Sequence, residues 1–277
     1  FCDQITTVSP RYAQEIRTKE LGYAYADVLE VNAGKLVGIL NGIDDVTWDP
    51  RTDTHLAARY HVNSKIRTAK RVNREALLKA LDASELARGQ RGPLVGSVGR
   101  LVYQKGTDLL LDAIPALLAD SDAQFVIIGS GETKLERQLK ELTLAWPDRV
   151  FCHIGYSETL AHQLEAASDI FVMPSRYEPC GLNQMYSLRY GTPPVVRETG
   201  GLADTVEDAD PHSLARGEAN GFVFREASSA ALGEALRRAF VWHARPKQWM
   251  KLMKTGMRGD YGWRNSAQAY LQLYRAE

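Results

Sequence analysis

Continuous apolar runs, rich in β-branched residues and separated by helical patterns, constrain the fold of this chain more than any other feature. Unbroken runs of this kind are typical of strands buried on both faces of a parallel sheet. Alternating strands and helices favour right-handed βαβ units. We therefore expect an α/β fold with a Rossmann-like parallel sheet and helices on both faces. The runs lie at residues 93–100, 124–131, 150–155, 170–175, 193–199 and, in a shorter form, 221–225.

Helical patterns fill the intervals between these runs. The segment 107–120 carries leucines at helical spacing after Thr107, which is a candidate N-cap. Pro115 lies inside this segment and is expected to kink or shorten the helix, because proline removes a backbone donor. Further helices are predicted at 132–146, 157–167 and 182–191.

The two ends of the chain have a different character from its middle. The first ten residues, "FCDQITTVSP", predict a strand followed by a turn, as if a domain were already under way. Residues 41–92 begin with a turn and continue as a polar, basic, helical connector into the α/β domain. The last part predicts two helices, broken between Gly256 and Gly262.

Composition narrows the classes of partner. Lysine plus arginine equals aspartate plus glutamate, at 34 each, so the global electrostatic case for nucleic acid is absent. No run approaches 18 apolar residues, so no membrane span is expected. The three cysteines, Cys2, Cys152 and Cys180, match neither a complete disulfide framework nor a zinc pattern. They favour reduced thiols in a reducing compartment.

Ligands bind at the carboxyl ends of parallel strands, so candidate chemistry lies just after each run. Arg100 ends the first run and Lys105 precedes Gly106 at the start of the next helix, which predicts an anion site suited to a diphosphate. An ordinary solvated loop is the alternative. Gly129 opens a Gly-Ser-Gly turn that suits either a dinucleotide or a tight strand-to-helix connection. Tyr156 follows a third run, where its ring could stack on a nucleobase or simply pack.

The stretch "EPCGL" (178–182) brings a carboxylate, a thiol and bare backbone to one turn. Gly181 lacks a Cβ, so a ligand can approach the main chain closely. The N–H groups of Gly181 and Leu182 are expected to form a second anion site opposite the two cations. Glu178 lies beside them and can accept hydrogen bonds from sugar hydroxyls. The cluster "EDAD" (207–210) is interpreted as a solvated loop rather than a metal site.

Four motifs together resemble a known family. "LNGID" (40–44), "GRLVYQKG" (99–106), "SRYEPCGLNQMYSLRYGTPPVVRETGGLADTV" (175–206) and the closing Trp-containing helix are similar to bacterial glycogen synthases and plant starch synthases. These are retaining glucosyltransferases of the GT-B type, which has two Rossmann-like domains. The resemblance implies the C-terminal half of such an enzyme. Residues 1–40 would end the N-terminal domain, 41–255 would form the sugar-nucleotide domain, and 256–277 would cross back to the N-terminal domain.

The resemblance also implies roles for individual residues. The catalytic residues would be Arg100 and Lys105, which neutralise the leaving diphosphate, and Glu178, which faces the donor glucose. Tyr156 would lie against adenine, Asn41 near the glucose, and Thr199 with Gly200 would close the phosphate side. The full set of substrate-binding residues would be Asn41, Gly129, Tyr156, Cys180, Gly181, Leu182, Thr199 and Gly200.

The implied reaction moves glucose from ADP-glucose to the 4-hydroxyl at the end of an α-1,4-glucan, with retention. No metal or cofactor is expected. The expected partners are the glucan, the nucleotide sugar and the missing N-terminal domain, in the cytoplasm or, for a plant-type source, the plastid. Two alternatives stay open: a GT-B transferase that uses UDP-glucose or another nucleotide sugar, and a non-catalytic nucleotide- or glucan-binding module.

The chain departs from the family pattern at several places. Tyr186 stands where many related transferases carry a second glutamate, Gly99 where a serine often precedes the arginine, and Asn183 where a threonine is common. The family's Lys-x-Gly-Gly loop and its histidine near the reacting sugar are expected upstream of Phe1. The chain would then hold half of the active-site cleft.

Overall fold

A parallel sheet of six strands forms the centre of the computed structural model, which describes residues 2–89 and 92–275. The strand order is β5-β4-β3-β6-β7-β8, and every neighbouring pair is parallel. The order reverses between β3 and β6, as in doubly wound Rossmann-like sheets. The predicted α/β fold is confirmed. The strands are β3 (Leu94–Val98), β4 (Gln124–Gly129), β5 (Val150–Ile154), β6 (Ile170–Met173), β7 (Pro194–Arg197) and β8 (Phe222–Phe224).

Each strand ends earlier than its predicted run. The apolar pattern extends past the last paired residue into glycines and polar residues, such as Gly99 after β3 and Ser175 after β6. These residues leave the sheet and form loops at its carboxyl edge. Sequence periodicity cannot separate the last strand residue from the first loop residue in a continuous run.

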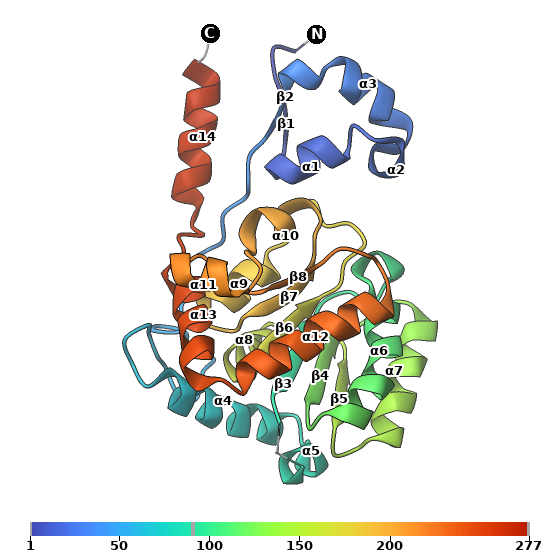
Figure 1. The fold of residues 1–277 in the computed structure, drawn as a ribbon, viewed down its shortest axis with the longest axis vertical. Helices are drawn as coiled ribbons and strands as arrows, with labels where there is room; N and C mark the ends of the chain where they lie inside the picture. The colour runs from blue at the N-terminus through green and yellow to red at the C-terminus, as the bar shows by residue number, and fades with distance from the viewer. Residues whose placement is uncertain (1, 90–91, 276–277) are drawn as a thin grey trace.

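Helices cover both faces of the sheet, and α12 crosses in front of the strands in Figure 1. Residues of β4 alternate between the faces: Phe125 and Ile127 join one buried cluster, and Val126 and Ile128 join another. The first cluster includes α6 (Thr107–Asp120), α7 (Thr133–Ala145), α12 (Ser229–His243) and α13 (Pro246–Arg258). The second includes α4 (Ile66–Ala80), α5 (Ser84–Arg88) and α8 (Glu158–Ala167). The remaining helices beside the sheet are α9 (Asn183–Arg189), α10 (Gly200–Thr205) and α11 (Pro211–Arg216).

The start and length of α6 correct two predictions. Gly106, with φ 66°, is the N-cap, and Thr107 is the first helical residue, buried and without a capping hydrogen bond. Pro115 lies inside the helix, which runs to Asp120 without being shortened. Leucines on both sides of the proline are buried in the core, so tertiary packing outweighs its low helix propensity. By contrast, the predicted helix at 157–167 has a side-chain cap: Ser157 accepts a hydrogen bond from Leu160 N at 3.3 Å at the start of α8.

The acidic run 207–210 is tied into the fold rather than merely solvated. The carboxylate of Asp210 caps α11, accepting from Ser213 N at 3.0 Å. Asp208 accepts from Val223 N at 2.7 Å and pairs with Arg238. These contacts give the run a structural role.

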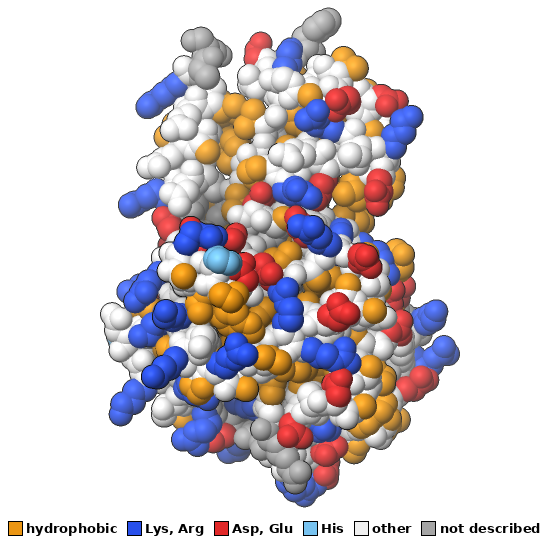
Figure 2. Space-filling view, viewed as in Figure 1, with side chains coloured by type: hydrophobic (Ala, Val, Ile, Leu, Met, Phe, Trp, Pro, Cys, Tyr) orange, Lys and Arg blue, Asp and Glu red, His pale blue; other side chains and the backbone are white. Residues whose placement is uncertain are grey.

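The two chain ends lie at the same end of the molecule (Figure 1). There, the N-terminal segment and α14 (Trp263–Arg275) stand above a wider lower body in the space-filling view (Figure 2). No helix among residues 2–89 and 92–275 is long and apolar enough to cross a membrane. The N-terminal segment contains β1 (Ile5–Thr7), α1 (Pro10–Glu15), α2 (Lys19–Gly22), η1 (Tyr23–Tyr25), α3 (Ala26–Val31), η2 (Ala33–Lys35) and β2 (Leu36–Gly38).

The predicted break near the C-terminus begins later than expected. Helix α13 continues through Gly256 to Arg258, and α14 begins at Trp263. A Cβ on Gly256 would lie 3.0 Å from Leu188 Cδ2 and 3.1 Å from Leu188 O. Gly256 therefore serves the close packing of α13 on α9 rather than ending the helix.

Candidate active site

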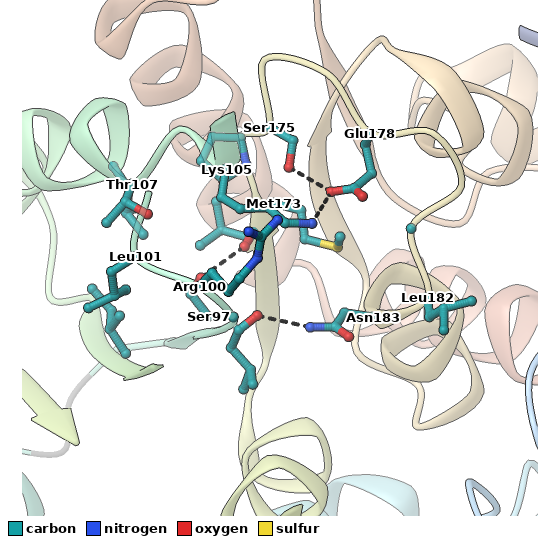
Figure 3. Close-up of a pocket in the computed structure, with 17 residues that line it drawn as sticks. Ser97, Arg100, Leu101, Lys105, Thr107, Met173, Ser175, Glu178, Leu182 and Asn183 are labelled. Carbon is teal, nitrogen blue, oxygen red and sulfur yellow. Dashed lines mark hydrogen bonds and ion pairs between the residues drawn. The ribbon is translucent and has the colours of Figure 1, made fainter. Parts of the chain in front are cut away.

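A cavity of 360 Å³ lies at the carboxyl ends of β3 and β6, where the strand order reverses. This is the position at which doubly wound sheets bind their ligands. Figure 3 shows the residues that line it, which come from β3, β4 and β6, from the loops after β3 and β6, and from the starts of α6 and α9. Five of the residues predicted from sequence line this cavity: Arg100, Lys105, Glu178, Gly181 and Leu182.

Lys105 and Glu178 form an ion pair inside the cavity. Lys105 Nζ lies 2.5 Å from Glu178 Oε2, and Ser175 Oγ donates to the same oxygen at 3.0 Å (Figure 3). The side chain of Glu178 is 7% exposed and that of Lys105 is 27% exposed. An ammonium has three donors, so Lys105 can hold Glu178 and still donate to an anionic ligand. The pair therefore joins the two groups that were predicted to act on the phosphate and on the sugar.

Arg100 lies at the mouth of the same cavity. It is exposed, and its Nη2 donates to Gln104 Oε1 at 3.0 Å. With Lys105 it places two cations on one rim, next to the helix that begins after Gly106. This arrangement is suited to an anion such as a diphosphate.

The turn before α9 is held by its own side chains. Gly181 has φ 70°, a left-handed conformation that favours glycine. Gln184 Nε2 donates to Gly181 O at 3.0 Å and to Cys180 O at 3.1 Å. Asn183 Nδ2 donates to Val98 O at 2.9 Å, so this amide ties α9 to the end of β3. The side chain that replaces the family's threonine is thus engaged in a structural contact.

Cys180 and Asn41 lie away from the lining of the 360 Å³ cavity. Cys180 is buried in a small apolar cluster with Ile43 and Met185. Burial raises the pKa of its thiol, although a hydrogen bond with the backbone of Asn41 acts in the opposite direction. Asn41 lines a different cavity, of 310 Å³, beside α14. The structure therefore does not bring these two residues to the cavity, and their predicted contacts with the donor stay predictions.

Thr199 and Gly200 contact a carboxylate of the chain itself. Gly200 N donates to Glu15 Oε1 at 3.0 Å and to Oε2 at 3.1 Å, and Thr199 Oγ1 donates to Oε2 at 3.1 Å. Glu15 belongs to α1 of the N-terminal segment. The group at the predicted phosphate side is thus an anion from another element. Sequence reasoning missed Glu15 because no local pattern relates residues this far apart.

Gly129 and Tyr156 differ in what surrounds them. A Cβ on Gly129 would lie 1.9 Å from Gly99 O, so the close approach of two backbones requires a glycine there. Tyr156 is 84% exposed, so its ring is open to a ligand and the alternative that it simply packs is wrong. Neither residue lines the 360 Å³ cavity.

In the part of the chain that the structure describes, no three His, Cys, Asp or Glu side chains are grouped so that they could hold a metal ion. The expectation of metal-free chemistry stays a prediction. The cavity itself is lined by two cations, Lys105 and Arg100.

Two family models match the chain. The model described as "Glycosyl transferases group 1" matches residues 79–251, which include the whole six-stranded sheet. The model described as "Starch synthase catalytic domain" matches residues 1–31. The two matches lie on the two parts of the molecule that Figure 1 separates.

Relatives of known name agree with these models. The chain is 53% identical to a glycogen synthase of Thioalkalivibrio sulfidiphilus (strain HL-EbGR7), over 99% of this chain and 56% of that protein. It is 47% identical to a glycogen synthase of Hydrogenovibrio crunogenus (strain DSM 25203 / XCL-2), over 100% of this chain and 57% of that protein. The chain therefore spans little more than half the length of the relatives that it matches.

A solved structure agrees as well. The catalytic domain of starch synthase IV from Arabidopsis thaliana, bound to ADP and acarbose, superposes with a TM-score of 0.90 at 39% identity. The match covers 99% of this chain and 56% of that one. The resemblance to glycogen and starch synthases, and the GT-B type of fold, are confirmed.

Proposed function

This chain belongs to the glycosyl transferases of group 1, and on that premise we propose that it forms the donor side of an α-1,4-glucan glucosyltransferase. The protein containing it would transfer glucose from ADP-glucose to the non-reducing 4-hydroxyl of a glycogen or starch chain, with retention. The observation that carries this proposal is the ion pair of Lys105 and Glu178 in the cavity where the strand order reverses. It joins a phosphate-binding cation to a sugar-facing carboxylate.

The chemistry follows from these charges. Breaking the bond between glucose and the diphosphate leaves negative charge on the leaving group and positive charge on the sugar. Arg100 and Lys105 stabilise the first, and Glu178 lies on the opposite side of Lys105, where it stabilises the second. Charges fixed before the reaction are often the largest catalytic contribution, and removing one donor lowers the rate by about 10²–10³.

Two observations support ADP as the nucleotide of the proposed donor. The starch synthase IV structure, 39% identical, was solved with ADP. In this chain Tyr156 leaves its ring exposed after β5, where it can stack on a base. No metal is required in this proposal, because the cations of Arg100 and Lys105 neutralise the diphosphate.

The acceptor is assigned to the other part of the protein. The relatives are nearly twice as long as this chain, so the glucan and the facing domain are proposed partners of the donor side. We expect the chain by itself to bind ADP weakly and to show little or no transfer. The cysteines at 2, 152 and 180 are free thiols, which favours the cytoplasm as the proposed location.

A donor-competition assay tests the proposal. The protein extended by its upstream half is given a glucan acceptor with ADP-glucose, UDP-glucose or both, and glucosyl transfer is measured. We expect ADP-glucose to support transfer and UDP-glucose to compete poorly. Equal or better use of UDP-glucose would favour the transferase with another donor. An absence of transfer from either would favour a non-catalytic binding module.

A further inference from the structure

Arg176 belongs to the loop that carries Glu178, and its side chain reaches the loop that carries Lys105 without lining the cavity. Its guanidinium forms a two-pronged ion pair with Asp108, in the first turn of α6: Nη1 to Oδ1 and Nη2 to Oδ2 are both 2.7 Å. The side chains are 16% and 28% exposed. Paired bonds of this kind fix orientation as well as distance.

The side chain of Arg176 also contacts the loop before α6. Arg176 Nη1 donates to Tyr103 O at 2.7 Å, and the guanidinium carbon lies 3.4 Å from the centre of the Tyr103 ring. Stacking of this kind adds a cation–π attraction to the hydrogen bonds. Arg176 thus contacts the segment on either side of Lys105.

Backbone and amide contacts complete the link between the loops. Arg176 N donates to Gln104 O at 2.8 Å, and Gln104 Nε2 donates to Tyr177 O at 3.1 Å. Gln104 also accepts from Arg100, the second cation of the cavity. The two loops, 73 residues apart at the ion pair, are therefore fastened together directly outside it.

We infer that Arg176 is a positioning residue that sets the place of Lys105 opposite Glu178 without touching the substrate. The inference rests on the proposed function, because it assigns Arg176 to the geometry of the donor site. An isolated ion pair at a surface contributes little, but this arginine combines a fork, a carbonyl contact and a stacked ring. Lysine lacks the planar fork and could not make these contacts together.

A double-mutant cycle on ADP affinity separates positioning from mere stability. The chain is titrated calorimetrically with ADP as wild type, Arg176→Gln, Lys105→Ala and the double variant, and each is melted. We expect Arg176→Gln to weaken ADP binding by about tenfold, the size of a lost charged hydrogen bond. In the Lys105→Ala background it should change affinity by less than about twofold, because its effect passes through Lys105. The melting temperature should fall equally in both backgrounds.

Companion variants sharpen the cycle. Arg176→Lys should bind ADP as weakly as Arg176→Gln, because lysine lacks the planar fork. Asp108→Asn should also weaken ADP binding about tenfold, and it replaces Arg176→Gln in the test if that variant does not fold. Arg237→Gln is the matched control, because Arg237 pairs with Asp120 at 2.7 Å on the exposed surface, and it should leave ADP affinity unchanged.

The outcomes distinguish this inference from the proposed function. If wild type binds ADP and Lys105→Ala weakens it, but Arg176→Gln and Asp108→Asn do not, positioning by Arg176 is wrong and the donor site stands. An equal loss in both backgrounds also overturns positioning. If wild type does not bind ADP, or Lys105→Ala has no effect on affinity, the assignment of the cavity and the role of Arg176 fail together.

Discussion

The 360 Å³ cavity, which is the proposed donor site, and the end of the molecule formed by the N-terminal segment with α14 differ in how their side chains are held. In the cavity, Glu178 is almost fully buried and bonded to both Lys105 and Ser175. In α14, Ser266 is the one buried residue of its described part, while Trp263 and Tyr274 are 52% and 70% exposed. Large exposed apolar surfaces mark sites of interaction. The difference indicates that the side chains of the cavity are held in place within this chain, whereas α14 leaves large apolar side chains exposed.

Contacts from Glu15 and Ser9 couple the two regions. Glu15 of the N-terminal segment binds Gly200 N and Thr199 Oγ1, and Gly201 N in turn donates to Glu178 O at 3.1 Å. Ser9 Oγ donates to Pro179 O at 2.7 Å. The segment therefore contacts the backbone of the turn that carries Glu178, the proposed catalytic carboxylate.

The largest expected effect lies in the cavity. Glu178→Gln, in the protein extended by its upstream half, should lower the transfer rate by about 10²–10³ while ADP affinity changes little. The amide keeps the shape of the side chain but removes the charge that steadies the sugar. Steady-state rates and ADP titration measure the two quantities. A variant as fast as wild type would refute the role of Glu178.

Cys180→Ser is the matched control within the same turn. The thiol packs against Ile43 and Met185 and its pKa is raised by burial, so it is protonated near neutral pH. We expect this variant to keep much of the transfer activity. If transfer is abolished with the fold intact, the packing role assigned to the thiol is wrong.

A pair of glycine substitutions compares how closely the backbone is packed in the six-stranded sheet and in the N-terminal segment. Gly129→Ala puts a Cβ 1.9 Å from Gly99 O, so the free energy of unfolding should fall by about 1–3 kcal/mol, as for other overpacked sites. Gly34→Ala, in the N-terminal segment, meets nothing within 4 Å and should change it by less than about 0.5 kcal/mol. Urea denaturation of the two variants measures both values, and equal losses would contradict the comparison.

Glu15→Gln tests the contact that joins the regions. The variant weakens the bonds to Thr199 and Gly200 by removing the charge, so the N-terminal segment should be cleaved faster by protease while the sheet persists. Glu30→Gln, which disrupts an exposed pair with Arg17, is the control and should leave the rate unchanged. Cleavage sites identified by mass spectrometry decide between them. Equal rates for Glu15→Gln and wild type would show that this contact does not hold the segment.

The smallest expected effect is on the way in which the stability of the protein depends on pH. Burial alone would raise the pKa of Asp53, yet hydrogen bonds from His162 and Tyr190 hold it below the usual value. A carboxyl whose pKa is lowered by folding stabilises the protein above its unfolded value, about 3.9, and loses that contribution as pH falls through the folded value. Urea denaturation between pH 5 and pH 3 should therefore show a smaller loss of stability in Asp53→Asn than in wild type. A steeper loss of stability in Asp53→Asn would show that folding does not lower the pKa of Asp53.

Much of the fold could be predicted because it depends on local patterns. Buried runs specify β3 to β8, and the position of Arg100, Lys105 and Glu178 after adjacent strands brings them to one cavity. Strand ends were less accurate, since the apolar runs continue into the loops. Pro115 does not shorten its helix, because burial of the leucines on both sides of it outweighs a local preference; a kink at this residue stays a prediction.

Contacts between distant elements were the part that sequence could not give. Two examples are the ion pair of Arg176 with Asp108 and the hydrogen bond of Gly200 N with Glu15. No sequence pattern relates the residues of either pair, so only the packed fold shows these contacts. Burial of Cys180 in an apolar cluster follows from the approach of the connector that carries Ile43. A glutamate in a helix and an arginine in a loop are, by themselves, ordinary surface residues.

A calorimetric titration of this chain alone with ADP tests the proposed donor site most directly, because the 360 Å³ cavity is lined by residues of this chain. We predict saturable binding at a single site, weakened by about tenfold in Arg100→Ala through the loss of one charged contact with the diphosphate. An absence of binding, or binding that is the same in Arg100→Ala and in Lys105→Ala as in wild type, would contradict it.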